Sequence, residues 1–184
     1  MGTDFENIAI VGAGAVGGYY GARLAQHGQE VHFLLRSDYA HVRARGLEVK
    51  SIDGDFSLGS DVIHVYDDAT AMPKADLVIV TLKSNENHHL ARLLPPLMHD
   101  GTTILTLQNG IGNEEHVAEL FGAQRVVGGI AFVCINRTGP GRIDHRESGY
   151  VQIAEFASHG RSERVERIVA MFNASGIRTW RSMT

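Results

Sequence analysis

The residues with the clearest chemical meaning are three glycines near the start of the chain. Gly12, Gly14 and Gly17 have the Gly-x-Gly-x-x-Gly spacing, which follows a short apolar run at residues 8–11 and precedes a segment of small residues. In this setting the first glycine allows a sharp turn, the second lets a phosphate approach the backbone, and the third lets a helix pack closely on a sheet. The free N–H groups at the helix start also favour an anion. The pattern indicates a dinucleotide site; the alternative is a tight structural turn.

Three polar residues that follow apolar strands are further candidates for ligand contacts. Arg36 comes directly after the predicted strand 30–35, where an acidic residue would contact the ribose hydroxyls of NAD and an arginine suits a 2′-phosphate. Lys83 and Asn109 each follow a later apolar run, and ligands of open α/β sheets bind at this end of the strands. The alternatives are a solvated arginine, a flexible surface lysine and an Asn-Gly turn.

Other site chemistry has little support in the sequence. The ten histidines show no His-Glu-x-x-His or paired spacing, so no metal site is predicted. The adjacent His88 and His89 are expected to point to different sides of a helix. Cys134 lies in a strand-like run, where burial is expected. Neither a Gly-x-Ser-x-Gly elbow nor a P-loop occurs, so neither triad chemistry nor ATP use is indicated.

Alternating strands and helices position the candidate residues. The helix after the glycines is expected at residues 15–26, with Gly28 at its C-terminal end. The apolar runs predict strands at 8–11, 30–35, 75–82, 103–107 and 126–133. Helices are predicted at 37–45, 85–98, 113–121 and 162–174. The second of these is expected to be interrupted near Pro95-Pro96, and the third to be capped by Asn113 with Val117, Leu120 and Phe121 facing inward. This alternation predicts an α/β fold with a Rossmann-type doubly wound, mainly parallel sheet.

Several segments lie outside this alternation. A hairpin about Asp53-Gly54 is expected beside the main sheet, and antiparallel strands are expected after the turn at residues 139–141. The remaining expected strands are 47–52 and 56–58 in the hairpin, 62–65 before the central run, 142–145 and 150–154 after the turn, and 177–180 near the end. There is no repeat or linker, so the prediction is one domain over residues 1–184.

The composition is that of a globular protein. Of the 184 residues, 43% are hydrophobic and 21% are charged. The net charge of −4 and the absence of a basic tail argue against nucleic acid as a partner. No apolar run is long enough to span a membrane. The one cysteine cannot form an internal disulfide, which favours a cytoplasmic location. Exposed sheet edges leave self-association open, as a homodimer or as aggregation.

Four motifs taken together resemble the N-terminal half of the ketopantoate reductase (2-dehydropantoate 2-reductase) family. They are Gly-Ala-Gly-Ala-Val-Gly at 12–17, Leu-Leu-Arg at 34–36, Val-Thr-Leu-Lys at 80–83 and Leu-Gln-Asn-Gly-Ile-Gly at 107–112. Val-Gly-Gly-Ile-Ala-Phe at 127–132 and Gly-Pro-Gly-Arg-Ile-Asp-His at 139–145 resemble the family's antiparallel segment. The resemblance covers nearly the whole chain. It implies an oxidoreductase that reduces ketopantoate, a small 2-oxo acid, to pantoate with NADPH, in pantothenate biosynthesis.

The resemblance also implies roles for individual residues. The pyrophosphate of NADPH would be held by Gly12, Ala13, Gly14, Ala15, Val16 and Gly17, and the 2′-phosphate by Arg36. Lys83 and Asn109 match family positions that contact the cofactor near the reaction crevice. One further contact is usually an alanine in the family, and the nearest match here is Ile135. The role of Ile135 is therefore left open.

One part of the family pattern has no match in this chain. In the family, a C-terminal helical domain carries the catalytic lysine and the residues that hold the substrate, and this chain stops at Thr184. No catalytic residue is therefore assigned, and the chain is expected to bind NADPH with little or no reductase activity. The open alternatives are another two-domain NAD(P)-dependent dehydrogenase of 2-oxo or related acids, and a stand-alone nucleotide-binding or redox-sensing module.

Overall fold

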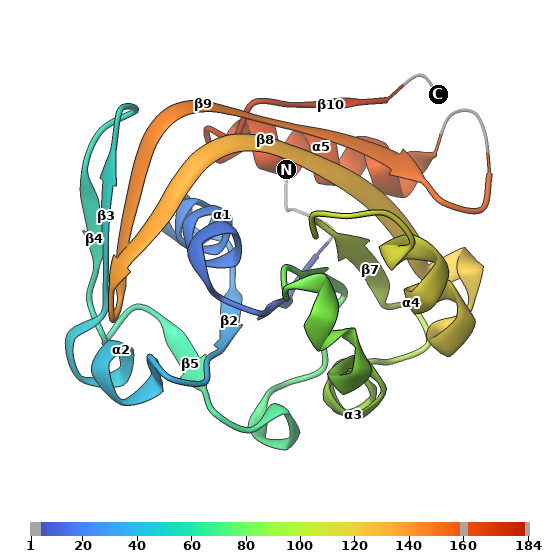
Figure 1. Cartoon of the computed structure of the whole chain (residues 1–184), viewed down its shortest axis with the longest axis horizontal. Helices are drawn as coiled ribbons and strands as arrows, with labels where there is room; N and C mark the ends of the chain where they lie inside the picture. The colour runs from blue at the N-terminus through green and yellow to red at the C-terminus, as the bar shows by residue number, and fades with distance from the viewer. Residues whose placement is uncertain (1–4, 159–161, 183–184) are drawn as a thin grey trace.

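A single curved sheet organises the protein (Figure 1). The computed structural model describes residues 5–158 and 162–182. Within them, ten strands form one sheet in the order β4-β3-β9-β8-β7-β6-β1-β2-β5, and β10 pairs with β9. The strands are β1 (Ile8–Val11), β2 (Val31–Leu34), β3 (Leu47–Ser51), β4 (Phe56–Leu58), β5 (His64–Tyr66), β6 (Leu77–Val80), β7 (Thr103–Thr106), β8 (Val126–Gly139), β9 (Arg142–Glu155) and β10 (Thr179–Arg181).

Six neighbouring strands make the parallel part of this sheet. Their order is β5-β2-β1-β6-β7-β8, and each neighbouring pair is parallel. Numbered along the chain within this part, the order is 3-2-1-4-5-6, which is that of the doubly wound dinucleotide-binding fold. The four residues of β1 are all buried, as are those of β2, β6 and β7. Burial on both faces explains why these strands read as continuous apolar runs.

Helices cover both faces of the parallel part. The α-helices are α1 (Ala15–Gln26), α2 (Tyr39–Arg45), α3 (Leu90–Leu93), α4 (Asn113–Phe121) and α5 (Glu163–Ala174). The 3-10 helices are η1 (Ala69–Ala71), η2 (Ser84–His89), η3 (Pro95–Leu97) and η4 (Ala123–Arg125). Residues of α1 and α5 share one buried core with alternate strand residues such as Ile8 and Ile10. Residues of α3, η3 and α4 share the other core with Ala9 and Val11. The doubly wound prediction is confirmed.

The outer part of β8 and the strands β9, β3 and β4 curl the sheet around α1. β8 and β9 form a long antiparallel ribbon, β3 pairs with β9, and β4 closes that end of the sheet. In Figure 1 this ribbon arches over α1, which contacts β1, β2, β3, β8 and β9. The helix is therefore held in the concave face of the sheet.

Several predicted boundaries were wrong for identifiable reasons. The helix expected at 85–98 is instead η2, the single turn α3 and η3, because Pro95 and Pro96 cannot continue helical bonding and the polar start favours turns. The separate segments 142–145 and 150–154 are one strand, since the β8–β9 ladder continues through three register shifts. The strand expected at 62–65 begins later, at His64.

Two expected roles in α4 were also wrong. Gly112, with a φ of +88°, is the N-cap in place of Asn113, whose amide bonds back to the preceding loop. Leu120 is exposed, because the side of α4 that packs on the core is formed by Val117, Ala118 and Phe121. In the described part of the chain, no helix is long and apolar enough to cross a membrane.

Candidate nucleotide-binding site

The glycine turn lies where the order of the parallel strands reverses, between β1 and β6. Val11 and Val80 are paired, so residues that follow β1 meet residues that follow β6. Gly12 has a φ of +96°, and a Cβ added there would lie 2.5 Å from the backbone nitrogen of Leu82. Only glycine fits this turn without displacing the neighbouring strand end. The sharp turn predicted at Gly12 is present.

Gly17 brings α1 against the sheet. A Cβ at this position would lie 2.2 Å from Thr81 Oγ1 and 2.9 Å from Ile10 Cγ2. The Thr81 hydroxyl donates a hydrogen bond to the carbonyl oxygen of Gly12 at 2.7 Å, which ties the turn to the end of β6. The third glycine thus permits the close helix–sheet packing that its spacing predicts.

The N-terminus of α1 is open to a ligand. Gly14 is its N-cap, is exposed, and has only the Gly12 carbonyl oxygen, at 3.9 Å, near the position of an added Cβ. The N–H groups of Ala15, Val16 and Gly17 have no acceptor one turn earlier in the helix. No acidic residue lies in the first turn. The helix start therefore combines free donors, a positive dipole end and space, which suits an anionic group.

Arg36 extends into solvent beyond the end of β2. Its side chain is 87% exposed, and its Nη1 lies 3.6 Å from Glu86 Oε2 on η2. The same carboxylate oxygen lies 3.2 Å from His89 Nε2. An exposed guanidinium held this loosely is free to exchange its partner for a phosphate.

Lys83 and Asn109 are exposed at the ends of β6 and β7, as their sequence positions predict. A chain of side-chain amides, not predicted from the sequence, connects the two loops. Gln108 Nε2 donates to Leu82 O at 2.9 Å and to Asn87 Oδ1 at 2.6 Å, and Asn87 Nδ2 donates to Asn113 Oδ1 at 3.0 Å. Asn113 Nδ2 completes the chain at the carbonyls of Asn109 and Gly110, both at 3.3 Å. The amide chain fixes both loops relative to each other.

A buried carboxylate beside the turn was also not predicted. Asp38 accepts hydrogen bonds from Arg137, from the backbone N–H of Gly141 at 3.1 Å and from Ser37 at 3.0 Å. Burial raises the pKa of Asp38, but these bonds and the charge of Arg137 outweigh it and hold the pKa below its ordinary value. The helix predicted from Ser37 therefore begins later, at Tyr39 with Asp38 as its N-cap, and Ser37 donates its hydroxyl to Asp38.

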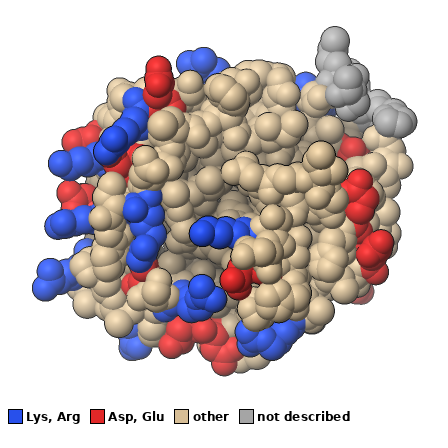
Figure 2. Space-filling view, in the orientation of Figure 1, with Lys and Arg blue, Asp and Glu red and all other residues tan. Residues whose placement is uncertain are grey.

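A pocket extends from the glycine turn to this ion pair. It is lined by Ala13, Gly14, Gly18, Phe33, Leu35, Asp38, Val42, Leu47, Arg137, Gly141, Arg142 and Ile143. Figure 2 shows a hollow near the centre of this face, with Lys and Arg side chains at its border and an acidic side chain beside them. The face that carries the turn is therefore concave and largely basic at its rim.

Other sequence expectations had mixed outcomes. Cys134 is exposed, because side chains alternate along the outer part of β8 and its position faces solvent. Ile135 is half-buried and packs on the core that contains α1. The rings of His88 and His89 lie 3.9 Å apart, so these residues do not point to different sides.

The fold also assembles two groups of His and Glu side chains that no motif indicates. One is Glu30, His32 and His64, and the other is Glu86, His88 and His89. The first group could not be found from spacing, because it depends on the pairing of β2 with β5. In each group the potential ligand atoms lie within 4.8 Å of one another, which makes both groups candidate metal sites among the described residues.

Sheet order, glycine turn and helix start together define a Rossmann-type α/β domain. The chain belongs to the ketopantoate reductase PanE/ApbA family, whose model matches residues 8–158. A 2-dehydropantoate 2-reductase of Nostoc sp. is 45% identical over 177 residues, which are 94% of this chain and 54% of that protein. The chain thus spans about half the length of the curated relatives it matches.

Solved structures agree with this assignment. The crystal structure of 2-dehydropantoate 2-reductase from Geobacter metallireducens is 46% identical, with a TM-score of 0.92, over 96% of this chain and 58% of that one. The ternary structure of D-mandelate dehydrogenase with NADH and anilino(oxo)acetate is 22% identical, with a TM-score of 0.84, over 96% of this chain and 56% of that one. The second likeness is one of fold.

Proposed function

We propose that this chain is the NADPH-binding half of an oxidoreductase of the 2-dehydropantoate 2-reductase type. The observation that carries the proposal is the open glycine turn at the strand reversal, with an arginine in place of an acid after β2. Family membership supports the same function. When bound, NADPH supplies a hydride for reduction of a ketone.

The chain's residues fit such a cofactor. The pyrophosphate would lie on the turn and helix start formed by Gly12, Ala13, Gly14, Ala15, Val16 and Gly17, where the N–H groups are free and the second glycine leaves room. The Arg36 guanidinium would bind the 2′-phosphate, leaving Glu86. Lys83 and Asn109 would contact the cofactor from the strand ends that the amide chain holds together.

The chain's own part in the reaction is binding and orientation. The two loops held by Gln108, Asn87 and Asn113 keep one wall of the site rigid. A rigid wall fixes the direction in which the bound cofactor faces a substrate. No catalytic acid is assigned among the described residues, and Lys83 is assigned to the cofactor side.

The test compares the affinity for NADPH with the affinity for NADH, measured by calorimetry on the parent chain and on Arg36→Asp. We expect the parent to bind NADPH at least tenfold more tightly than NADH, because charge-assisted bonds contribute about 1.5–3 kcal/mol. Arg36→Asp should remove most of this preference. Arg92→Asp, an equal charge change on exposed α3, is the matched control and should keep it. Equal affinity of the parent for both cofactors would contradict the role of Arg36.

We propose a small 2-oxo acid as the substrate of the whole protein, with ketopantoate first. The names of the family and of the Nostoc relative support this choice. The alternative is a different 2-oxo or related acid, as the substrate of another two-domain NAD(P)-dependent dehydrogenase. Full-length protein assayed with NADPH and a panel of 2-oxo acids decides between them.

The single, unpaired cysteine supports a cytoplasmic setting.

A further inference from the structure

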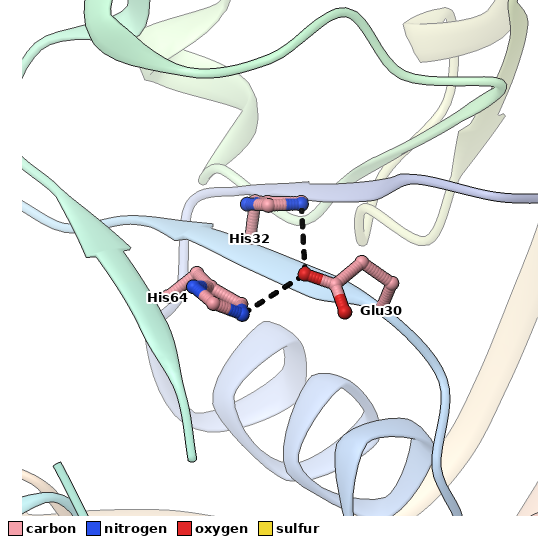
Figure 3. Close-up of side chains that lie close together, drawn as sticks. All are labelled: Glu30, His32 and His64. Carbon is pink, nitrogen blue, oxygen red and sulfur yellow. Dashed lines mark ion pairs between the residues drawn. The ribbon is translucent and has the colours of Figure 1, made fainter. Parts of the chain in front are cut away.

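Two histidines and a glutamate meet at the end of the sheet opposite the glycine turn (Figure 3). Glu30 immediately precedes β2, His32 lies on β2, and His64 opens β5. The register of the two parallel strands pairs His32 with His64, so both rings stand on neighbouring strands beside the Glu30 carboxylate. This group lies at the amino ends of β2 and β5. The glycine turn lies at the opposite edge of the sheet, where the parallel strands have their carboxyl ends.

The distances between the potential ligand atoms are close to those of a metal centre. Glu30 Oε1 lies 2.9 Å from His64 Nε2 and 3.5 Å from His32 Nε2. All three ligand atoms lie within 4.8 Å of one another. In a tetrahedral zinc site with bonds of about 2.0–2.1 Å, neighbouring ligand atoms are about 3.3–3.4 Å apart. The His64 side chain is 49% exposed, which leaves its ring room to turn toward this arrangement.

The surroundings of His32 favour a cation at its Nε2. That nitrogen faces two acceptor oxygens, Glu30 Oε1 and Asn7 Oδ1, the latter at 3.3 Å. The other ring nitrogen, Nδ1, lies 3.2 Å from the Tyr66 hydroxyl, which can accept a hydrogen bond from it. A metal-binding histidine needs this arrangement, with one nitrogen donating to a partner and the other presenting its lone pair. Burial, followed by the nearby His64, lowers the pKa of His32 against the effect of Glu30.

We propose that Glu30, His32 and His64 bind a divalent transition metal of the Zn²⁺ type, with Asn7 Oδ1 or a water as the fourth ligand. Two imidazoles and a carboxylate suit Zn²⁺, Co²⁺ or Ni²⁺ and do not suit Mg²⁺ or Ca²⁺, which prefer oxygen ligands alone. The bound ion joins β5, a three-residue edge strand, to β2. It therefore stabilises an edge that is otherwise held by few backbone bonds.

The group Glu86, His88 and His89 is the competing location for a metal. Its carboxylate is already paired with Arg36 and His89, and two of its three members are adjacent residues on an exposed 3-10 helix. It has no buried histidine, whereas the His32 side chain is 7% exposed. The test therefore includes both groups.

The experiment is a calorimetric titration of Zn²⁺ into the chelator-treated full chain, with Co²⁺ absorption as a readout of tetrahedral coordination. We expect one equivalent to bind and the thermal midpoint to rise with Zn²⁺. His64→Gln and Glu30→Gln should each weaken binding at least tenfold. Tyr66→Phe should weaken it about tenfold, since loss of the partner that orients a metal-bound histidine costs about 10–100-fold. The double variant His88→Gln/His89→Gln is the matched control and should bind like the parent.

Both primary substitutions change side chains that are about half exposed, at 49% for His64 and 50% for Glu30. Unfolding midpoints of the metal-free variants show whether the fold is kept. The proposal is overturned if the parent chain does not bind one equivalent, if His64→Gln binds as the parent does, or if the His88/His89 variant loses the binding. It is supported only if the loss follows Glu30, His64 and Tyr66.

Discussion

Replacing Gly17 with alanine tests the close packing of α1 on the strand ends. The new Cβ would lie 2.2 Å from Thr81 Oγ1, 2.9 Å from the Gly12 carbonyl oxygen and 2.9 Å from Ile10 Cγ2. Overpacking of this kind costs about 1–3 kcal/mol. Displacing Thr81 also weakens its 2.7 Å bond to Gly12, at a cost of about 1 kcal/mol. Alanine gains about 1 kcal/mol over glycine inside a helix, which leaves a net destabilisation of about 2 kcal/mol.

Gly14→Ala is the matched control for stability and the opposite test for binding. An added Cβ at Gly14 meets only the Gly12 carbonyl oxygen, at 3.9 Å, so it adds no clash, and the weaker preference of alanine for the N-cap should cost less than about 1 kcal/mol. The same methyl group would occupy the space left for a pyrophosphate. We therefore expect Gly14→Ala to be less destabilised than Gly17→Ala and to lose NADPH binding.

The assay for this pair is thermal unfolding followed by circular dichroism, together with NADPH titration of each folded variant. A loss of about 2 kcal/mol corresponds to a thermal midpoint about 4–8 °C lower for a protein of this size. If Gly17→Ala were as stable as the parent, the helix would not be pressed against Thr81 as described. If Gly14→Ala bound NADPH like the parent, the pyrophosphate would not lie over the second glycine.

Three further predictions concern the rim of the site. Glu86→Gln releases Arg36 from its 3.6 Å contact, so NADPH should bind a few-fold more tightly while NADH is unchanged; equal changes for both cofactors would count against this. Asp38→Asn should lower stability by about 1–3 kcal/mol at pH 7, because Arg137 and the Gly141 N–H lose a charged acceptor. Since the pKa of folded Asp38 is depressed, its contribution is complete above the unfolded pKa of about 3.9 and is lost as pH falls through the folded pKa. The stability difference between parent and Asp38→Asn should therefore shrink below about pH 4, and a constant difference would refute the pairing.

The core of the fold was predictable because its signals are local. Residues 15–26 were expected as a helix and form α1, since the glycine turn marks its start and Gly28 its end. The apolar runs of the parallel strands were also predicted, with ends within two residues of the observed ones except at β8, which continues beyond the run 126–133 to Gly139. For instance, the run 75–82 became β6 at Leu77–Val80. Strong periodicity and glycine positions carry this information without tertiary contacts.

Features that depend on pairing between distant segments were not predictable. The sequence predicted separate strands at 142–145 and 150–154. They form one strand, because the pairing of β9 with β8 continues across three register shifts. The bond between Asp38 and Arg137 joins residues 99 apart. The Glu30–His32–His64 group requires β5 beside β2, and nothing in its spacing indicates that neighbour. Cys134 shows the same limit, because the pairing register of a strand decides whether a given side chain faces the core or solvent.

The proposed function requires the N-terminus of α1 and Arg36 to bind NADPH together. A crystal structure of the chain with NADPH would show this contact. We expect pyrophosphate oxygens within about 2.7–3.1 Å of the N–H groups of residues 15–17, with the 2′-phosphate on the Arg36 guanidinium and Glu86 displaced from it. A nucleotide bound away from the glycine turn, or one whose 2′-phosphate faces solvent away from Arg36, would contradict it.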